Sequence, residues 1–171
     1  MLRALIFGVA ITVGLGVAKA EDPMTFERLT EIIQAVDPEA EFQGTSARLT
    51  VEEVPVFVVA DPTNDRMRAM ISIRSIDEVT PDEMYRMMQA NFDSALDARY
   101  AVAQGRLMSV FIHPLRPLEK DQFLSGLGQV VNLALTYGTA YTGGALTFGG
   151  GDSAELHREL IDKLLKQGEP I

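Results

Sequence analysis

The chain has 171 residues, of which 47% are hydrophobic and none is cysteine, so there is room for one packed domain and none for disulfides, thiolate metal sites or a cysteine nucleophile. With 15 basic and 24 acidic residues, its formal net charge is -9. This charge works against binding to a phosphate backbone or an anionic membrane surface, so we expect no nucleic-acid partner.

The first twenty residues have the three regions of a secretory signal peptide. Arg3 supplies the positive charge, an apolar run extends to Val17, and Ala18-Lys19-Ala20 forms a small-x-small cleavage site. An uncleaved anchor is the alternative, but the apolar run falls short of the roughly 20 residues that span a bilayer. We therefore expect cleavage after Ala20, a periplasmic or secreted protein, and no stable membrane insertion after cleavage.

An amphipathic helix is expected directly after the signal peptide. Asp22-Pro23 can begin it and Asp37-Pro38 ends it. Its apolar face follows the helical period and consists of Phe26, Leu29, Ile32, Ile33 and Val36.

Four stretches with strand character follow, separated by turn-forming residues: 41–43, 47–51, 56–60 and 66–74. Residues 56–59 are apolar without alternation, which predicts a strand covered on both faces. The stretch 66–74 alternates, so one side is expected to pack and the other to face water. The packed side is Met67, Ala69, Ile71 and Ile73. The solvated side is Arg66, Arg68, Ser72 and Arg74.

A capped helix and a hairpin form the unit around which the chain is organised. Thr80-Pro81-Asp82-Glu83 has the composition of a capping box, with proline where no N–H is needed. Residues 100–103 and 106–113 are predicted strands joined at Gln104-Gly105, where glycine supplies a positive φ. Helical spacing gives the helix an apolar face of Met84, Met87, Met88 and Phe92.

Two further helices are expected towards the C-terminus. The first is predicted from Leu118 to Tyr141, and its Gly126 and Gly128 each cost about 1 kcal/mol against alanine, so we expect them to mark close approach to a strand or helix. A glycine-rich linker over 143–151 precedes the second. That helix is expected to dock on its own domain or on a second copy through Leu156, Leu160, Ile161, Leu164 and Leu165.

These elements predict an α+β fold, an antiparallel sheet with flanking helices in the order α-β-β-β-α-β-β-α, plus a C-terminal helix. That order has three strands before the second helix, although four stretches have strand character. The chain would divide into a signal peptide (1–20), an α+β domain (21–142), and a linker with an amphipathic helix (143–171).

The second helix carries hydrophobic pairs that lead to an asparagine, Met84-Tyr85-Arg86-Met87-Met88-Gln89-Ala90-Asn91-Phe92, and the hairpin and long helix follow it. With its acidic mature chain, the protein resembles the type III secretion chaperones and the YbjN-like family over roughly Thr25 to Tyr141. The resemblance implies a type III secretion chaperone-like fold and a homodimer or protein-binding module of chaperone-like or regulatory type. It implies no catalytic residues.

Six methionines suit three different roles: Met67, Met70, Met84, Met87, Met88 and Met108. Their thioethers can fill core gaps, form an adaptable peptide groove, or bind copper(I) with His113. No tight Met-x-Met or His-Met cluster occurs, so we expect no metal. The candidate partner-binding residues are Met84, Met87, Met88, Phe92, Arg66, Arg68 and Arg74. The three arginines either pair with a partner's carboxylates or form a solvated face.

Enzyme signatures fail when tested. Gly126-x-Gly128 lacks a third glycine, no nucleophile elbow or Walker loop occurs, and His113 and His157 are far apart in sequence. We expect no enzyme and no cofactor, but an exported module that binds a protein or peptide or associates with itself. The alternative is a small-molecule or lipid carrier with an apolar cavity between the long helix and the sheet. A third hypothesis is an enzyme with an unrecognised site.

Overall fold

The computed structural model describes residues 22–93, 95–137 and 154–169, so the expected signal peptide and the glycine linker lie outside the described residues. The first half contains α1 (Phe26–Val36), β1 (Glu41–Gln43), β2 (Ser46–Val51), β3 (Val54–Asp61) and β4 (Arg66–Ser75). The second half contains η1 (Ile76–Glu78), α2 (Pro81–Asp93), β5 (Arg99–Ala103), β6 (Arg106–His113), α3 (Lys120–Thr136) and α4 (Ala154–Gly168).

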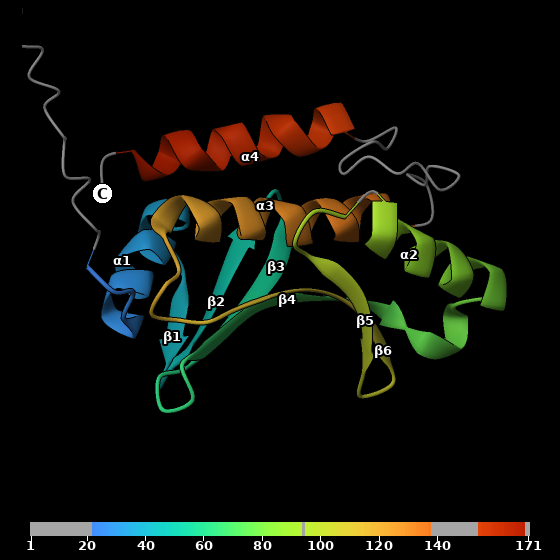
Figure 1. Cartoon of the computed structure of the whole chain (residues 1–171), viewed down its shortest axis with the longest axis horizontal. Helices are drawn as coiled ribbons and strands as arrows, with labels where there is room; N and C mark the ends of the chain where they lie inside the picture. Colours follow the sequence, from blue (N-terminus) through green and yellow to red (C-terminus); the bar gives the residue numbers. More distant parts are fainter. Residues whose placement is uncertain (1–21, 94, 138–153, 170–171) are drawn as a thin grey trace, which may run out of the picture.

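The strands form one antiparallel sheet in the order β1-β2-β3-β4-β6-β5. All the described helices lie on one side of it or at its β5 end: α1 and α3 cover the sheet, α4 lies on α3, and α2 stands beside β5 (Figure 1). The α+β class with an antiparallel sheet and flanking helices is therefore confirmed. Four strands precede α2, one more than the expected order, because the turn at Gly44 separates β1 from β2.

Local sequence signals place most element boundaries. Thr80 and Glu83 form the expected capping box at α2, with hydrogen bonds of 3.2 Å from Glu83 N to Thr80 Oγ1 and 2.8 Å from Thr80 N to Glu83 Oε2. Gln104 and Gly105 both have positive φ in the hairpin turn. The first helix, however, is capped by Thr25 rather than begun at Asp22-Pro23.

The core lies between the sheet and α1 and α3. Alternate residues of β2, β3 and β4 are buried, and the largest fully buried side chains of the helices are Leu29, Ile32, Ile33, Phe123, Leu124 and Leu127. Two buried hydroxyl groups tie α3 to the hairpin: Ser109 donates to the Val130 carbonyl and Tyr100 to the Leu133 carbonyl, both at 2.8 Å.

The two glycines of α3 face opposite layers. A Cβ on Gly126 would lie 2.6 Å from the ring of Phe111 on β6, whereas one on Gly128 would lie 2.9 Å from Ile161 Cγ1 on α4. The prediction that these glycines mark close approach is confirmed for both. Because α3 is covered by the sheet on one side and by α4 on the other, it needs a small residue at each interface.

The C-terminal helix docks on its own domain. Leu160 and Leu164 are buried against α3, and the Lys120 ammonium donates to the Gly168 carbonyl at 2.8 Å. Lys163 also pairs with Glu52 in the turn between β2 and β3. α4 runs antiparallel to α3, with Gly168 beside Leu124 and Ile161 beside Gly128.

The predicted alternation of β4 fails at Arg74. Met67, Ala69 and Ile71 are buried as expected, but the pairing with β6 shifts between Ser72 and Arg74. A β-bulge of this kind inserts one residue and reverses the faces that follow. Arg74 is therefore opposite Leu107 on the helix side, with its guanidinium 4.7 Å from the centre of the Tyr137 ring.

Candidate functional site

The side of the sheet opposite α1 and α3 carries an apolar centre that no described helix covers, and we call it the open face (Figure 1). Cross-strand register places neighbouring residues on it, because directly paired residues of antiparallel strands point to the same side. Its apolar centre consists of Phe57, Val59, Met70, Met108, Val110 and Ile112. One row runs Phe57, Met70, Val110, and the next runs Val59, Arg68, Ile112.

The centre of the open face is accessible to water. Phe57 is 41% exposed, Val59 36% and Ile112 54%, while Met70, Met108 and Val110 are half-buried by their neighbours. Single exposed apolar residues are ordinary on protein surfaces, but a contiguous group of six across three strands is typical of an interaction site.

A hollow of about 470 Å³ lies at one end of the open face. Its lining combines apolar and charged side chains: Val59, Asp61, Arg66, Met67, Arg68, Met70 and Ile112. Asn64 donates two hydrogen bonds to the Asp61 carboxylate, one from its side-chain amide and one from its backbone N–H. They hold the pKa of the Asp61 carboxyl below its ordinary value, so Asp61 stays ionised opposite Arg66 at neutral pH.

Arginines surround the apolar centre. Arg48 lies with its guanidinium 5.8 Å from the centre of the Phe57 ring, and Arg106 donates to the Ser72 hydroxyl. Arg66 and Arg68 line the hollow. The face can therefore offer a partner both apolar contact and donors for carboxylates.

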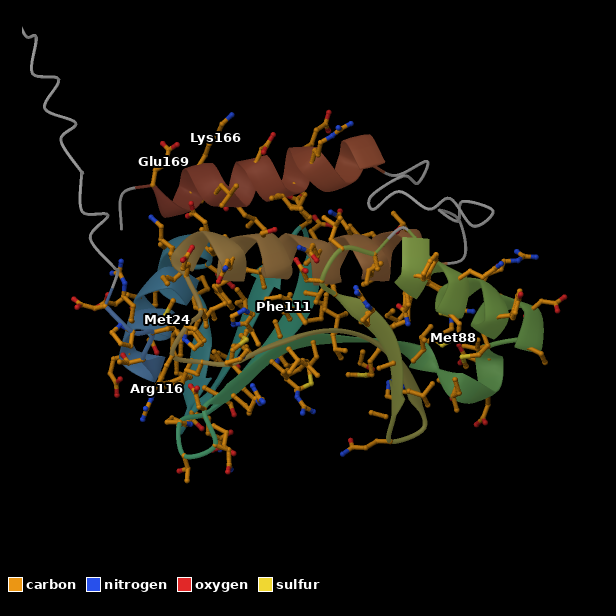
Figure 2. The ribbon with its side chains drawn as sticks, in the orientation of Figure 1. Met24, Met88, Phe111, Arg116, Lys166 and Glu169 are labelled. Atoms are coloured by element: carbon orange, nitrogen blue, oxygen red, sulfur yellow. The ribbon has the colours of Figure 1, made fainter. Side chains whose placement is uncertain are left out.

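Only two of the seven candidate binding residues of the sequence lie on this face. Arg66 and Arg68 do, but Arg74 lies on the helix side, 3.8 Å from the Glu78 carboxylate. Figure 2 shows Met88 on α2 at the end of the molecule opposite to Arg116, and the Arg116 N–H is bonded to Asp65, next to Arg66. The structure therefore does not bring the α2 residues together with Arg66 and Arg68.

The predicted apolar face of α2 is divided between core and solvent. Met87 is fully buried and Met84 half-buried, whereas Met88 and Phe92 are 47% and 64% exposed. Tyr85, which is 67% exposed, continues their line. The helix thus has an inner side for the core and an outer stripe of Tyr85, Met88 and Phe92.

The residues that sequence reasoning missed are Phe57, Val59, Val110 and Ile112. The prediction that residues 56–59 are covered on both faces is wrong: Val56 and Val58 are buried, whereas Phe57 and Val59 lie on the open face. The apolar run 56–59 could have indicated the open face, because a strand with one uncovered apolar face has the same run of apolar residues as a strand covered on both faces.

The outer edge of β5 is closed at Tyr100. Both its backbone groups are bonded to the side-chain amide of Asn91 on α2, at 2.7 Å for the N–H and 3.1 Å for the carbonyl. At the other edge, β1 has only three residues. Covered and short edges resist strand addition, so the open face is the better binding surface than either edge.

The interior does not favour the carrier hypothesis. Phe123, Leu124 and Leu127 are fully buried, and α3 approaches the sheet closely at Gly126. A hollow of about 540 Å³ beside the start of α3 is lined by no methionine and by a single phenylalanine, together with charged and polar residues: Asp97, Arg99, Phe111, Ile112, His113, Asp121, Gln122 and Ser125. It lies where the start of α3 meets the start of β5 and the end of β6.

Among residues 22–93, 95–137 and 154–169, no group of three or more His, Asp or Glu side chains is placed to hold a metal ion. No helix in this part of the chain is both long and apolar enough to cross a membrane.

No protein-family model and no curated protein sequence matches the chain. Solved structures of similar fold include the HopA1–SchA chaperone–effector complex, at 6% identity and a TM-score of 0.49 over 64% of this chain and 91% of that one. Another is the Yersinia pestis type III secretion chaperone SycH in complex with a fragment of YscM2, at 15% identity and 0.49 over 66% and 99%. The ExsC–ExsE complex matches at 14% and 0.46 over 61% and 89%.

Proposed function

We propose that this chain is a non-enzymatic module that binds another polypeptide on the open face of its sheet. The observation that supports the proposal is the contiguous apolar centre around Phe57, Met70 and Val110, uncovered in the described part of the chain and surrounded by arginines. An apolar centre with a polar rim is the usual anatomy of a protein interface.

The remaining expectations extend this proposal. The sequence of residues 1–20 supports export, so the binding would take place in the periplasm or outside the cell. The YbjN-like relationship stays a prediction from the sequence.

Self-association is a second form of the proposal, and the α2 stripe of Tyr85, Met88 and Phe92 favours it. Light scattering on the chain from Glu21 onward would give its mass as a function of concentration. A dimer that disappears in the Tyr85→Ser/Phe92→Ser variant would support this form, and a monomer at all concentrations would exclude it.

Selection from a displayed library of random 12-residue peptides tests the open face. Phe57→Ser/Ile112→Ser removes two exposed apolar side chains from the face, and Tyr85→Ser/Phe92→Ser is the matched control on α2. We expect selected peptides to bind the first variant at least about tenfold more weakly, which corresponds to a loss of about 1.4 kcal/mol of binding free energy. Their affinity for the control variant should be unchanged. Peptides that bind both variants as they bind the unaltered chain would contradict the proposal.

A further inference from the structure

The open face is basic, although the molecule is acidic. Cross-strand register places four arginines on it: Arg48, Arg66, Arg68 and Arg106. Arg99 at the start of β5 instead donates to the Leu96 and Ala98 carbonyls. The carboxylates that the six strands place on the same side are Glu41 and Asp61. The chain as a whole has a formal charge of -9. The sheet therefore concentrates positive charge on a surface that also has an uncovered apolar centre.

The arginines beside the hollow are available to a partner. The ion pairs found among the described residues are Arg28–Glu31, Arg74–Glu78 and Lys163–Glu52, and none of them involves Arg48, Arg66 or Arg68. Arg66 and Arg68 are exposed and one residue apart on the same side of β4. Guanidinium groups at that spacing can bind carboxylates of a segment lying across the strands.

We propose that the open face selects an acidic amphipathic segment of a partner polypeptide, whose apolar side chains lie on Phe57, Met70 and Ile112 and whose carboxylates pair with Arg66 and Arg68. This inference rests on the proposed function and adds the chemistry of the partner. Charge complementarity sets which segments bind and how fast, while the apolar centre supplies most of the affinity.

A second copy of the chain fits this face poorly. A two-fold dimer through the open face would bring the same patch of each copy together, so arginines would meet arginines. Repulsion of this kind across an interface is unfavourable.

An anionic membrane also fits poorly. Charges act over about 8 Å at physiological ionic strength, so a short segment bound on the face meets mainly the local arginines. A bilayer surface extends beyond the face and meets the acidic remainder of the molecule.

The peptide selection also tests this inference, by the charge of the selected sequences and their response to two pairs of substitutions. Arg66→Gln/Arg68→Gln removes two positive charges from the open face. Arg86→Gln/Arg158→Gln removes two exposed charges from α2 and α4 and is the control. Fluorescence anisotropy at 50 and 300 mM salt gives the affinity of each selected peptide.

We expect the peptides that depend on Phe57 and Ile112 to carry net negative charge, to bind Arg66→Gln/Arg68→Gln about fivefold more weakly, and to bind more weakly at 300 mM salt. Peptides that depend on Phe57 and Ile112 but are neutral or basic would overturn the inference and leave the proposed function intact. Peptides that do not depend on this face would overturn both. Dimerisation lost in Phe57→Ser/Ile112→Ser, or binding to anionic vesicles lost in it, would assign the face to another occupant and also overturn the inference.

Discussion

Asn91 of α2 takes the place of a neighbouring strand for Tyr100 of β5. Its side-chain amide accepts from the Tyr100 N–H at 2.7 Å and donates to the Tyr100 carbonyl at 3.1 Å. The pair anchors α2 to the sheet and occupies the backbone groups of Tyr100 that an added strand would use. Strand addition at this point of the β5 edge is therefore disfavoured relative to binding on the open face.

Replacement of Asn91 by alanine is expected to lower the free energy of unfolding by about 1–3 kcal/mol, because two hydrogen bonds between α2 and the backbone of Tyr100 are lost. Urea denaturation measures this change. The control Gln34→Ala alters an exposed position of α1 and should stay within about 0.5 kcal/mol of the unaltered chain. Equal stability of Asn91→Ala and Gln34→Ala would show that the amide does not anchor α2.

Alanine at Gly126 is expected to destabilise the chain by about 1–3 kcal/mol, because its Cβ would lie 2.6 Å from the ring of the buried Phe111. Thermal or urea unfolding measures the effect. In a Phe111→Leu background, where the ring is absent, the added cost of Gly126→Ala should become smaller. A cost that is the same in both backgrounds would exclude the ring contact as its cause.

The substitution Gly128→Ala tests the packing of α4, again by unfolding measurements in two backgrounds. Its Cβ would lie 2.9 Å from Ile161 Cγ1, an atom that Ile161→Ala removes. In that background we expect Gly128→Ala to be less unfavourable than in the unaltered chain by about 1 kcal/mol or more, because the contact at 3.3 Å with Leu164 Cδ1 remains but the closest one is gone. If Gly128→Ala has the same effect in both backgrounds, α4 does not pack on Gly128.

Displacement of α4 is expected to expose apolar surface on α3. Leu164→Asp places a charge at a buried contact of α4, whereas Gln167→Asp makes a similar change at an exposed position of the same helix. Fluorescence of an apolar dye should increase for Leu164→Asp and stay unchanged for Gln167→Asp. No difference between the two variants would contradict docking of α4 on its own domain.

The start of α2 is expected to lose stability in acid. Hydrogen bonds from the Thr80 N–H and then the Thr80 hydroxyl hold the pKa of the Glu83 carboxyl below its ordinary value of 4.5. A group whose pKa is lowered by folding stabilises the fold fully above its unfolded pKa and loses that contribution as the pH falls through the folded pKa. Stability measured from pH 6 to pH 3 should therefore fall less steeply in Glu83→Gln. Equal slopes would exclude this role for Glu83.

Local chemistry predicted most of the fold. The capping box at Thr80, the turn at Gly105 and the alternation of residues 66–72 each specify their element through neighbours in sequence. The two packing glycines can be recognised from the sequence because glycine is unfavourable inside a helix. The layers that they face cannot be predicted in this way, because Phe111 and Ile161 approach α3 only in the folded chain.

The candidate site could be predicted only in part. Arg66 and Arg68 were identified from alternation, but the bulge that moves Arg74 to the helix side depends on pairing with β6 and has no signal in β4 alone. The same limit applies to residues 56–59, because an apolar run does not say whether a second layer covers the strand. The open face depends on the placement of all the described helices on one side of the sheet or at its β5 end, which no single stretch of sequence specifies.

Methionine-methyl NMR on the chain from Glu21 onward, titrated with a peptide selected on it, tests the central claim most directly. Met70 and Met108 report on the open face, Met88 on the outer side of α2, and Met87 on the core. We predict that the bound peptide shifts the Met70 and Met108 methyl signals and leaves those of Met88 and Met87 in place. Shifts at Met88 with Met70 and Met108 unchanged would place the binding site on α2 and contradict the account.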